Sequence, residues 1–89
     1  MSKKEAKYAQ ELDLLLKAGE IKEIVPQFKL SLDVNGKHIT NYFVDFMVIT
    51  KDGTKQLHEV KGFSTDLWRI KWLLTEAIYG NEYEMIVIK

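Results

Sequence analysis

The stretch VDFMVITKDGTKQLHEVK, residues 44–61, decides the fold because it holds two strand-forming runs separated by a turn signal. Its KDG segment, residues 51–53, predicts a three-residue hairpin loop with Gly53 in the left-handed conformation. The run before the loop is apolar at almost every position, which indicates a central strand covered on both sides. Strict alternation predicts two faces for it, one with Phe43, Met47 and Ile49 and the other with Tyr42, Val44, Phe46 and Val48.

Two acidic residues interrupt this apolar hairpin. If Thr50 and Thr54 flank the loop, the antiparallel register places Asp45 directly opposite Glu59. Cross-strand Cβ atoms lie about 5 Å apart, so two carboxylates there repel unless one is protonated or a cation lies between them. The alternation also directs Glu59 and Lys61 to the same face.

A second hairpin precedes this one. QFKLSLDV and HITNYFVDFMVI are joined by Asn35-Gly36, which is the strongest short signal for a two-residue turn. The register of this turn sets Gln27 opposite Val44, on the face away from Asp45, and a bulge near Pro26 would move Gln27 to the other face.

A helix is predicted from a Ser2 cap to about Ala18, with a stop at Gly19. Glu5 falls within the apolar stripe of this helix, so it lies either at an exposed helix end or beside a partner such as a cation. The residues of the stripe that we expect to be buried are Tyr8, Ala9, Leu12, Leu15 and Leu16.

A second helix follows the motif and leads to a last strand, YEMIVIK. Ser64 or Thr65 caps it and Gly80 ends it. Its expected core stripe consists of Leu67, Ile70, Leu74, Ala77 and Ile78, with Trp68, Trp72 and Tyr79 alongside. The order is α-β-β-β-α-β, so we expect one α+β (α/β) domain over residues 1–89, with a mixed sheet flanked by helices.

Composition excludes several functions. The 89 residues contain 13 Lys and Arg against 13 Asp and Glu, so the chain does not have a broad basic coat for nucleic acid. It has no Cys, which excludes disulfides and thiol chemistry. It has no apolar run of the roughly 20 residues that a membrane span needs, and no signal-peptide pattern, so we expect a soluble, cytoplasmic protein.

The charged residues around the hairpin have the chemistry of a metal site. Asp45 and Glu59 offer hard oxygen ligands suited to Mg²⁺, with Mn²⁺ as a substitute, and the backbone carbonyl of Val60 could complete the shell. Lys61 could polarise a water or a phosphate oxygen. Together they would carry out metal-assisted phosphodiester hydrolysis.

The pattern Asp45…Glu59-Val60-Lys61 in this order of elements resembles the PD-(D/E)XK, or restriction-endonuclease-like, nuclease superfamily. Val44 stands where the superfamily pattern has Pro, which many members also lack. The stretches SKKEAKYAQELDLLLKAGEI, PQFKL, VDF, HEVKGF and TDLWRIK look like a family of small phage proteins labelled only as a domain of unknown function. This resemblance implies that Glu5 is the helix-borne acid of the metal site, and that Gln27 orients the phosphate or the water.

The resemblance implies a divalent-metal-dependent DNA endonuclease, phage-related and acting in recombination in the host cytoplasm. Its small size favours branched DNA such as Holliday junctions, and cutting two strands favours a homodimer, for which exposed Trp or Tyr on the second helix could form the interface. The alternative is a non-catalytic nucleic-acid-binding or assembly module that retains the fold. Residues that could contact the DNA backbone are Lys3, Lys4, Lys7, Arg69 and Lys71.

Both histidines are better explained without a ligand. His58 alternates to the face away from Glu59, and His38 lies beside a turn, so we expect structural or solvent-facing roles. The Trp68 and Trp72 pair at i, i+4 is more typical of core or dimer contacts than of base stacking.

Overall fold

The order of elements is the predicted one. The computed structural model describes residues 2–61 and 65–89. Its elements are α1 (Lys3–Lys17), β1 (Ile21–Val34), β2 (Lys37–Thr50), β3 (Lys55–Val60), α2 (Asp66–Tyr79) and β4 (Glu84–Ile88). The strands form one mixed sheet in the order β1-β2-β3-β4, in which only the β3–β4 pair is parallel. The predicted α+β fold is therefore confirmed.

Both helices begin at the predicted kind of cap. The Ser2 hydroxyl accepts the Glu5 backbone N–H at 3.1 Å, and the Thr65 hydroxyl accepts the Trp68 backbone N–H at 3.1 Å. These bonds satisfy N–H groups that a helix start leaves without partners. Thr65 is thus a cap, whereas the alternative, Ser64, lies outside the described residues. Gly19, in the left-handed region at φ +78°, follows the end of α1.

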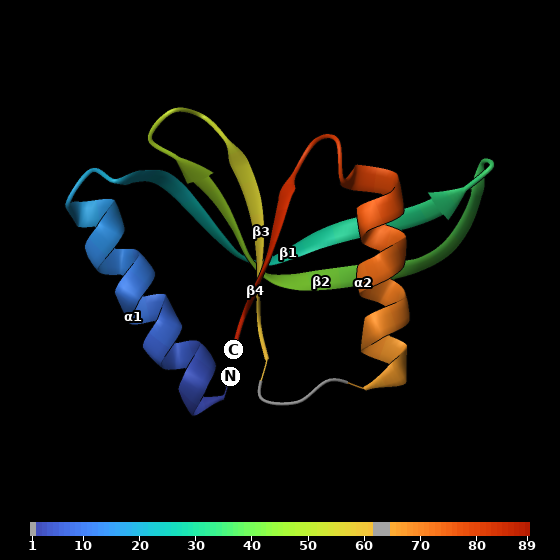
Figure 1. The fold of residues 1–89 in the computed structure, drawn as a ribbon, viewed down its shortest axis with the longest axis horizontal. Helices are drawn as coiled ribbons and strands as arrows, with labels where there is room; N and C mark the ends of the chain where they lie inside the picture. The colour runs from blue at the N-terminus through green and yellow to red at the C-terminus, as the bar shows by residue number, and fades with distance from the viewer. Residues whose placement is uncertain (1, 62–64) are drawn as a thin grey trace.

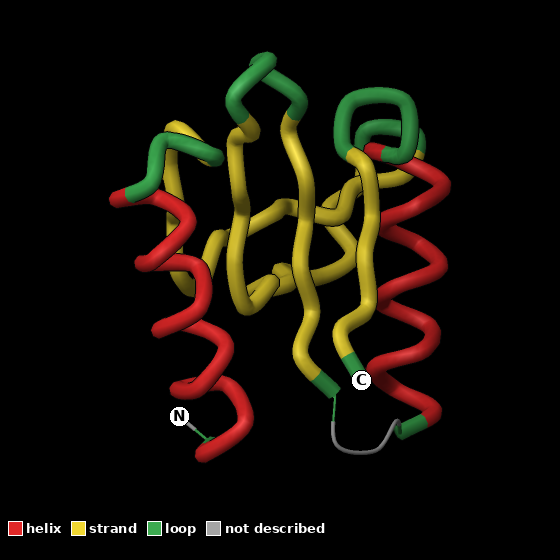
Figure 2. The backbone as a smooth tube through the Cα atoms, turned by 60° about the vertical axis from the view of Figure 1, so that its left-hand side comes forward, coloured by secondary structure: helices red, strands yellow, loops and turns green. Residues whose placement is uncertain are grey.

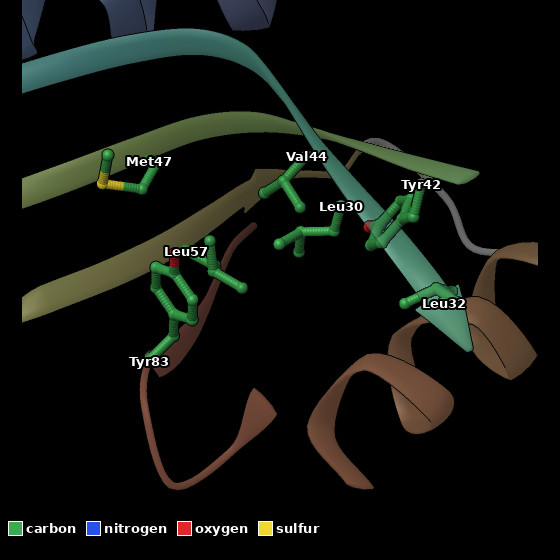
Figure 3. Packing of buried hydrophobic residues seen from close by; sticks show 7 residues of the cluster. All are labelled: Leu30, Leu32, Tyr42, Val44, Met47, Leu57 and Tyr83. Atoms are coloured by element: carbon green, nitrogen blue, oxygen red, sulfur yellow. The ribbon is translucent and has the colours of Figure 1, made fainter. Parts of the chain in front are cut away.

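The two helices lie on opposite faces of the sheet (Figures 1 and 2). The sheet separates two apolar clusters, one under each helix. The α1 side contains Leu12, Ile21, Phe46, Val48 and Val60, with Tyr8 and Ala9 packed against them. The larger cluster on the α2 side, shown in Figure 3, contains Leu30, Leu32, Tyr42, Val44, Met47, Leu57 and Tyr83. The sheet is thus covered on both sides, as the apolar run in β2 predicts.

The predicted alternation along β2 is wrong at one point. Val44 belongs to the α2-side cluster together with Met47, whereas Phe46 belongs to the α1-side cluster. Neighbouring strand residues normally face opposite sides, so the alternation is broken between Val44 and Met47, beside Asp45. Tyr42 consequently lies on the α2 side, on the same side as Met47.

The β1–β2 register also differs from the one expected from its turn. Leu32 pairs with Thr40 but Asp33 pairs with His38, which leaves Ile39 as an extra residue in β2. This bulge shifts the register by one residue, so Val44 pairs with Phe28 instead of Gln27. The corrective bulge therefore lies near the hairpin turn and not near Pro26.

Gln27 consequently falls opposite Asp45, between the pairs Pro26–Phe46 and Phe28–Val44. Its backbone has a left-handed φ of +49°, which is uncommon for a residue with a side chain. Figure 1 shows the β1–β2 pair changing direction across the middle of the sheet. Both strands are therefore irregular at the level of Asp45.

The helices bury narrower stripes than the sequence predicts. On α1, Leu12 is buried but Leu15 and Leu16 are exposed, because the contact with the sheet is made by the preceding turns. On α2, Leu67 and Ile70 are exposed, and the buried face is that of Trp68, Trp72, Thr75 and Tyr79. The large aromatic side chains cover the sheet because they bury more apolar area than the aliphatic ones.

Candidate functional site

Asp45 and Glu59 meet where the β2–β3 ladder ends. The last regular pair is Phe46 with His58, so the next position in the same register joins Asp45 and Glu59, as predicted. Asp45 Oδ2 accepts the backbone N–H of Val60 at 2.8 Å, in place of a strand carbonyl. The two acids keep only 9% and 5% of their surfaces exposed. The structure thus places two buried carboxyl groups side by side.

This burial is electrostatically unfavourable for two negative charges. The pKa of Glu59 is raised to about 7, chiefly by loss of solvent and also by the neighbouring Asp45 carboxyl, while the Tyr42 hydroxyl and Lys61 act in the opposite direction. A carboxyl with so high a pKa is only partly ionised at neutral pH. The pair is therefore a place where a cation could replace a proton.

Lys61 supplies one positive charge at this pair. Its Nζ lies 3.9 Å from Glu59 Oε2 and 4.4 Å from the centre of the Trp68 ring. The ring face attracts the ammonium group and holds it on the side of the sheet that carries Glu59. The predicted common orientation of Glu59 and Lys61 is confirmed.

Tyr42 and Trp68 complete a ring of contacts that the sequence did not reveal. The Tyr42 hydroxyl donates to Glu59 Oε1 at 2.5 Å, and Trp68 Nε1 donates to the Tyr42 oxygen at 2.9 Å. Burial, followed by the neighbouring Glu59, raises the pKa of Tyr42, so its hydroxyl remains a donor. Tyr42 was missed because strict alternation places it on the wrong face.

Glu5 and Gln27 lie on the other side of Asp45. Gln27 Nε2 donates to Glu5 Oε2 at 3.4 Å. Burial raises the pKa of Glu5, and the charge of Asp45 raises it as well. Of the two explanations for Glu5, the structure therefore favours a helix acid held beside the site over a frayed end.

Asp45 and Glu59 nevertheless form only a pair, with Glu5 nearby, and the three do not form one compact cluster of acids. Within residues 2–61 and 65–89, no three His, Asp or Glu side chains are close enough together to hold a metal ion. The pair still fits Mg²⁺ or Mn²⁺, because Mg²⁺ is commonly bound by one or two carboxylates, with waters and substrate phosphates as the other ligands. Val60 is buried in the α1-side cluster and its backbone N–H bonds to Asp45, and its carbonyl stays a predicted ligand.

Basic side chains lie beside the site on two helices. Lys4 Nζ donates to the Lys61 backbone carbonyl at 2.6 Å. With Lys7 and Lys89 it lines a cavity of about 220 Å³ between α1 and the ends of β3 and β4. Lys71 lines a groove with Tyr42 and Trp68. Of the other two predicted DNA contacts, Lys3 is exposed near the α1 start and Arg69 is exposed on α2, away from its buried face.

The histidines have the structural positions expected for them. His58 is buried on the α1 side, with Nδ1 2.6 Å from the Tyr8 hydroxyl and Nε2 2.9 Å from Gln56 Oε1. His38 lies beside the β1–β2 turn, 2.7 Å from Asp33. Neither ring faces the acidic pair.

A comparison with known proteins places the chain in a family. The family described as "Protein of unknown function (DUF1064)" matches residues 1–89, so the chain belongs to this family. No curated protein and no solved structure matches it. None of the described helices combines the length and the apolar character that a membrane crossing requires.

Proposed function

We propose that the protein is a divalent-metal-dependent DNA endonuclease that hydrolyses phosphodiester bonds. The observation that carries the proposal is the buried pair of Asp45 and Glu59 at the end of the β2–β3 ladder, with Lys61 beside it. A buried acid with a pKa of about 7, in contact with a second acid, is more typical of a functional site than of a core. The element order and the D…E-x-K pattern also support a metal-dependent nuclease.

The ligands of the proposed ion are Asp45 and Glu59, with Glu5 reaching it directly or through water and Val60 offering its carbonyl. A bound Mg²⁺ or Mn²⁺ would polarise the phosphate and lower the pKa of the attacking water. Neutralising two adjacent carboxylates would also remove the repulsion that their burial creates.

Lys61 is the residue that we assign to the scissile phosphate. Its ammonium group lies close enough to Glu59 to reach a phosphate that is bound at the same metal ion. It can donate hydrogen bonds to an oxygen of that phosphate. Trp68 fixes the direction of this group, and Tyr42 fixes the orientation of the Glu59 carboxylate. Gln27, bonded to Glu5, can orient the water or the phosphate.

The proposed substrate is branched DNA in the cytoplasm of a phage-infected host. All described elements belong to the sheet and its two covering helices, so none is a separate element for reading base sequence. Lys4, Lys7 and Lys71 lie where they could contact the backbone phosphates on either side of the site. A dimer would bring two such sites to the two strands.

The test is cleavage of a labelled four-way junction, a splayed duplex, linear DNA and an RNA hairpin, each with Mg²⁺, Mn²⁺ or EDTA. We expect metal-dependent cutting of the branched DNA by the wild type, and its loss in Asp45→Asn and Lys61→Met. The exposed Glu23→Gln variant removes an acid elsewhere in β1 and should cut normally. Cutting that survives in EDTA, or in Asp45→Asn, would overturn the proposal, and cutting of the RNA alone would change the substrate.

One observation favours the alternative, a non-catalytic nucleic-acid-binding or assembly module. Val60 and Tyr42 already give Asp45 and Glu59 one hydrogen bond each, so the chain itself partly satisfies the acids. If the wild type binds branched DNA but does not cut it, and Mn²⁺ does not raise its melting temperature, the alternative is correct. A folded-state metal site would raise that temperature by mass action.

A further inference from the structure

The outer face of α2 is apolar although nothing in the described chain covers it. Leu67, Ile70 and Leu73 are 64%, 62% and 56% exposed, whereas Thr75 on the opposite face is fully buried. Scattered exposed leucines are common on protein surfaces, but three large aliphatic side chains within two turns of one helix form a patch. Such a patch indicates an interaction surface.

The spacing of this face is that of a helix–helix seam. Positions 66, 70, 73 and 77 are separated by four, three and four residues, which is the spacing of a coiled-coil contact, and they are Asp66, Ile70, Leu73 and Ala77. All four are exposed. The aromatic residues of the buried face lie on the other side of the helix, so α2 has one face for its own sheet and another with no partner.

The two flanks of the seam differ in character. The residues that precede Ile70 and Ala77 are Arg69 and Glu76, which are exposed and opposite in charge. The residues that follow Asp66 and Leu73 are Leu67, which is exposed, and Leu74, which is partly buried and packs against the α2-side cluster. One flank is therefore charged with both signs, and the other is apolar.

We propose that this α2 face, made of Asp66, Ile70, Leu73 and Ala77, binds the same face of a second copy of the chain with the two helices antiparallel. Antiparallel pairing around a two-fold axis brings like flanks together, so exposed Arg69 meets the partner's exposed Glu76 twice. Ile70 packs against the partner's Leu73 in the centre. A parallel pair would set the charged flank of one helix against the apolar flank of the other.

The β1–β2 hairpin extends the α2 face on one side. Phe43 is exposed, and it lines a groove of about 300 Å³ together with Leu67, Trp68 and Lys71. A helix of 14 residues is about 21 Å long, so two such helices alone bury less than the roughly 1,600 Å² of a standard interface. We therefore expect a dimer that dissociates in the micromolar range.

This interface differs from the one expected from the sequence. Trp68, Trp72 and Tyr79 pack against the α2-side cluster and are not the exposed residues of the helix. Self-association through the aliphatic face does not depend on nuclease activity, so the two proposals can fail separately.

The first test is the molar mass in solution, measured by analytical ultracentrifugation from about 1 to 200 µM. The wild type should shift from monomer to dimer over this range, and Leu73→Lys should stay monomeric with an unchanged circular dichroism spectrum, since the Leu73 side chain is 56% exposed. The matched control is Leu14→Lys on α1, which replaces an even more exposed leucine away from the α2 face and should dimerise normally. A wild type that is monomeric at 200 µM would overturn self-association and leave another protein as the partner.

The second test checks the antiparallel arrangement. Arg69→Glu gives each interface two Glu–Glu contacts, and Glu76→Arg gives two Arg–Arg contacts, so each variant should dimerise at least several-fold more weakly. A mixture of the two variants restores both opposite-charge contacts and should form a heterodimer, and the double variant should recover dimerisation. If each variant dimerises as the wild type does, or the mixture gains nothing over either variant, the proposed pairing is wrong.

Discussion

His58 and Glu59 are consecutive residues of β3, both are buried, and each meets a tyrosine hydroxyl, yet their environments differ completely. His58 faces α1, and both its ring nitrogens have neutral partners, Tyr8 and Gln56. Glu59 faces α2, where it meets Tyr42 and Lys61 but also a second carboxyl group from Asp45.

The pKa shifts express this difference. Burial lowers the pKa of His58, which keeps the ring neutral and suited to its apolar cluster. The pKa of Glu59 is raised to about 7, chiefly by burial, because Tyr42 and Lys61 compensate its charge only in part and Asp45 adds a second acid. The comparison teaches that burial alone does not mark a functional residue. A functional residue is indicated instead by a buried ionisable group whose charge is only partly balanced by its partners within the chain.

The largest effect should follow from removing the charge at Glu59. Glu59→Gln keeps the size and the Tyr42 contact but loses a metal ligand, so we expect cleavage to fall roughly 1,000-fold, which corresponds to about 4 kcal/mol of transition-state stabilisation. His58→Gln should lower the melting temperature but reduce cleavage by less than about 10-fold when assayed below that temperature. Initial rates under single-turnover conditions measure both. Equal losses of cleavage in Glu59→Gln and His58→Gln would contradict the functional difference between the two faces of the sheet.

The next effect concerns stability in the presence of metal. At 100 times the dissociation constant, an ion that binds only the folded chain adds about 2.7 kcal/mol, which for a domain of this size raises the melting temperature by roughly 10 °C or more. We expect this shift with Mn²⁺ in the wild type and in His58→Gln, and its absence in Glu59→Gln. Differential scanning fluorimetry with Mn²⁺ and with EDTA provides the measurement. A shift that persists in Glu59→Gln would place the ion elsewhere.

The two tyrosines give a smaller and more specific contrast. Tyr8→Phe leaves a nitrogen of buried His58 without its partner and should cost about 1–3 kcal/mol of stability, with no change in metal affinity. Tyr42→Phe keeps the ring in the α2-side cluster but frees the Glu59 carboxylate, and it should weaken metal affinity or cleavage about 10-fold. Urea unfolding and Mn²⁺ titration separate the two variants. The comparison is contradicted if Tyr8→Phe weakens metal binding as much as Tyr42→Phe does.

The smallest effect is expected at Trp68. Trp68→Phe retains an aromatic face for Lys61 but weakens the attraction by about 0.5–1 kcal/mol and removes the bond to Tyr42, so cleavage should fall by roughly 2- to 10-fold. Trp72→Phe is the matched control, because Trp72 stacks on Trp68 in the same cluster without contacting the ammonium group. Similar losses in both variants would indicate a packing effect.

The parts of the fold set by local chemistry could be predicted. The KDG turn determined the β2–β3 register and hence the meeting of Asp45 and Glu59, and the caps at Ser2 and Thr65 determined where the helices begin. These features depend on a few consecutive residues, so the sequence alone contains them.

The parts set by tertiary packing could not be predicted. Leucines and tryptophans on α2 compete for the same sheet surface, and only the shape of the sheet decides that Trp68 is turned inward and Ile70 outward. The change in alternation beside Asp45 also depends on tertiary packing, because β1 and β2 become irregular at the same level. For this reason the sequence indicated the acids and Lys61 but not Tyr42.

The extra residue Ile39, beside the β1–β2 turn, sets the strand register that places the Gln27 side chain at the acidic pair. It lies far along the strand from Asp45, yet it determines which residue of β1 stands opposite that acid. Deleting Ile39 would pair Val44 with Gln27 and so move the Gln27 side-chain amide away from the site. All the acids and Lys61 would be unchanged. A relative could therefore keep the complete acidic motif and still differ in chemistry because its hairpin is one residue shorter.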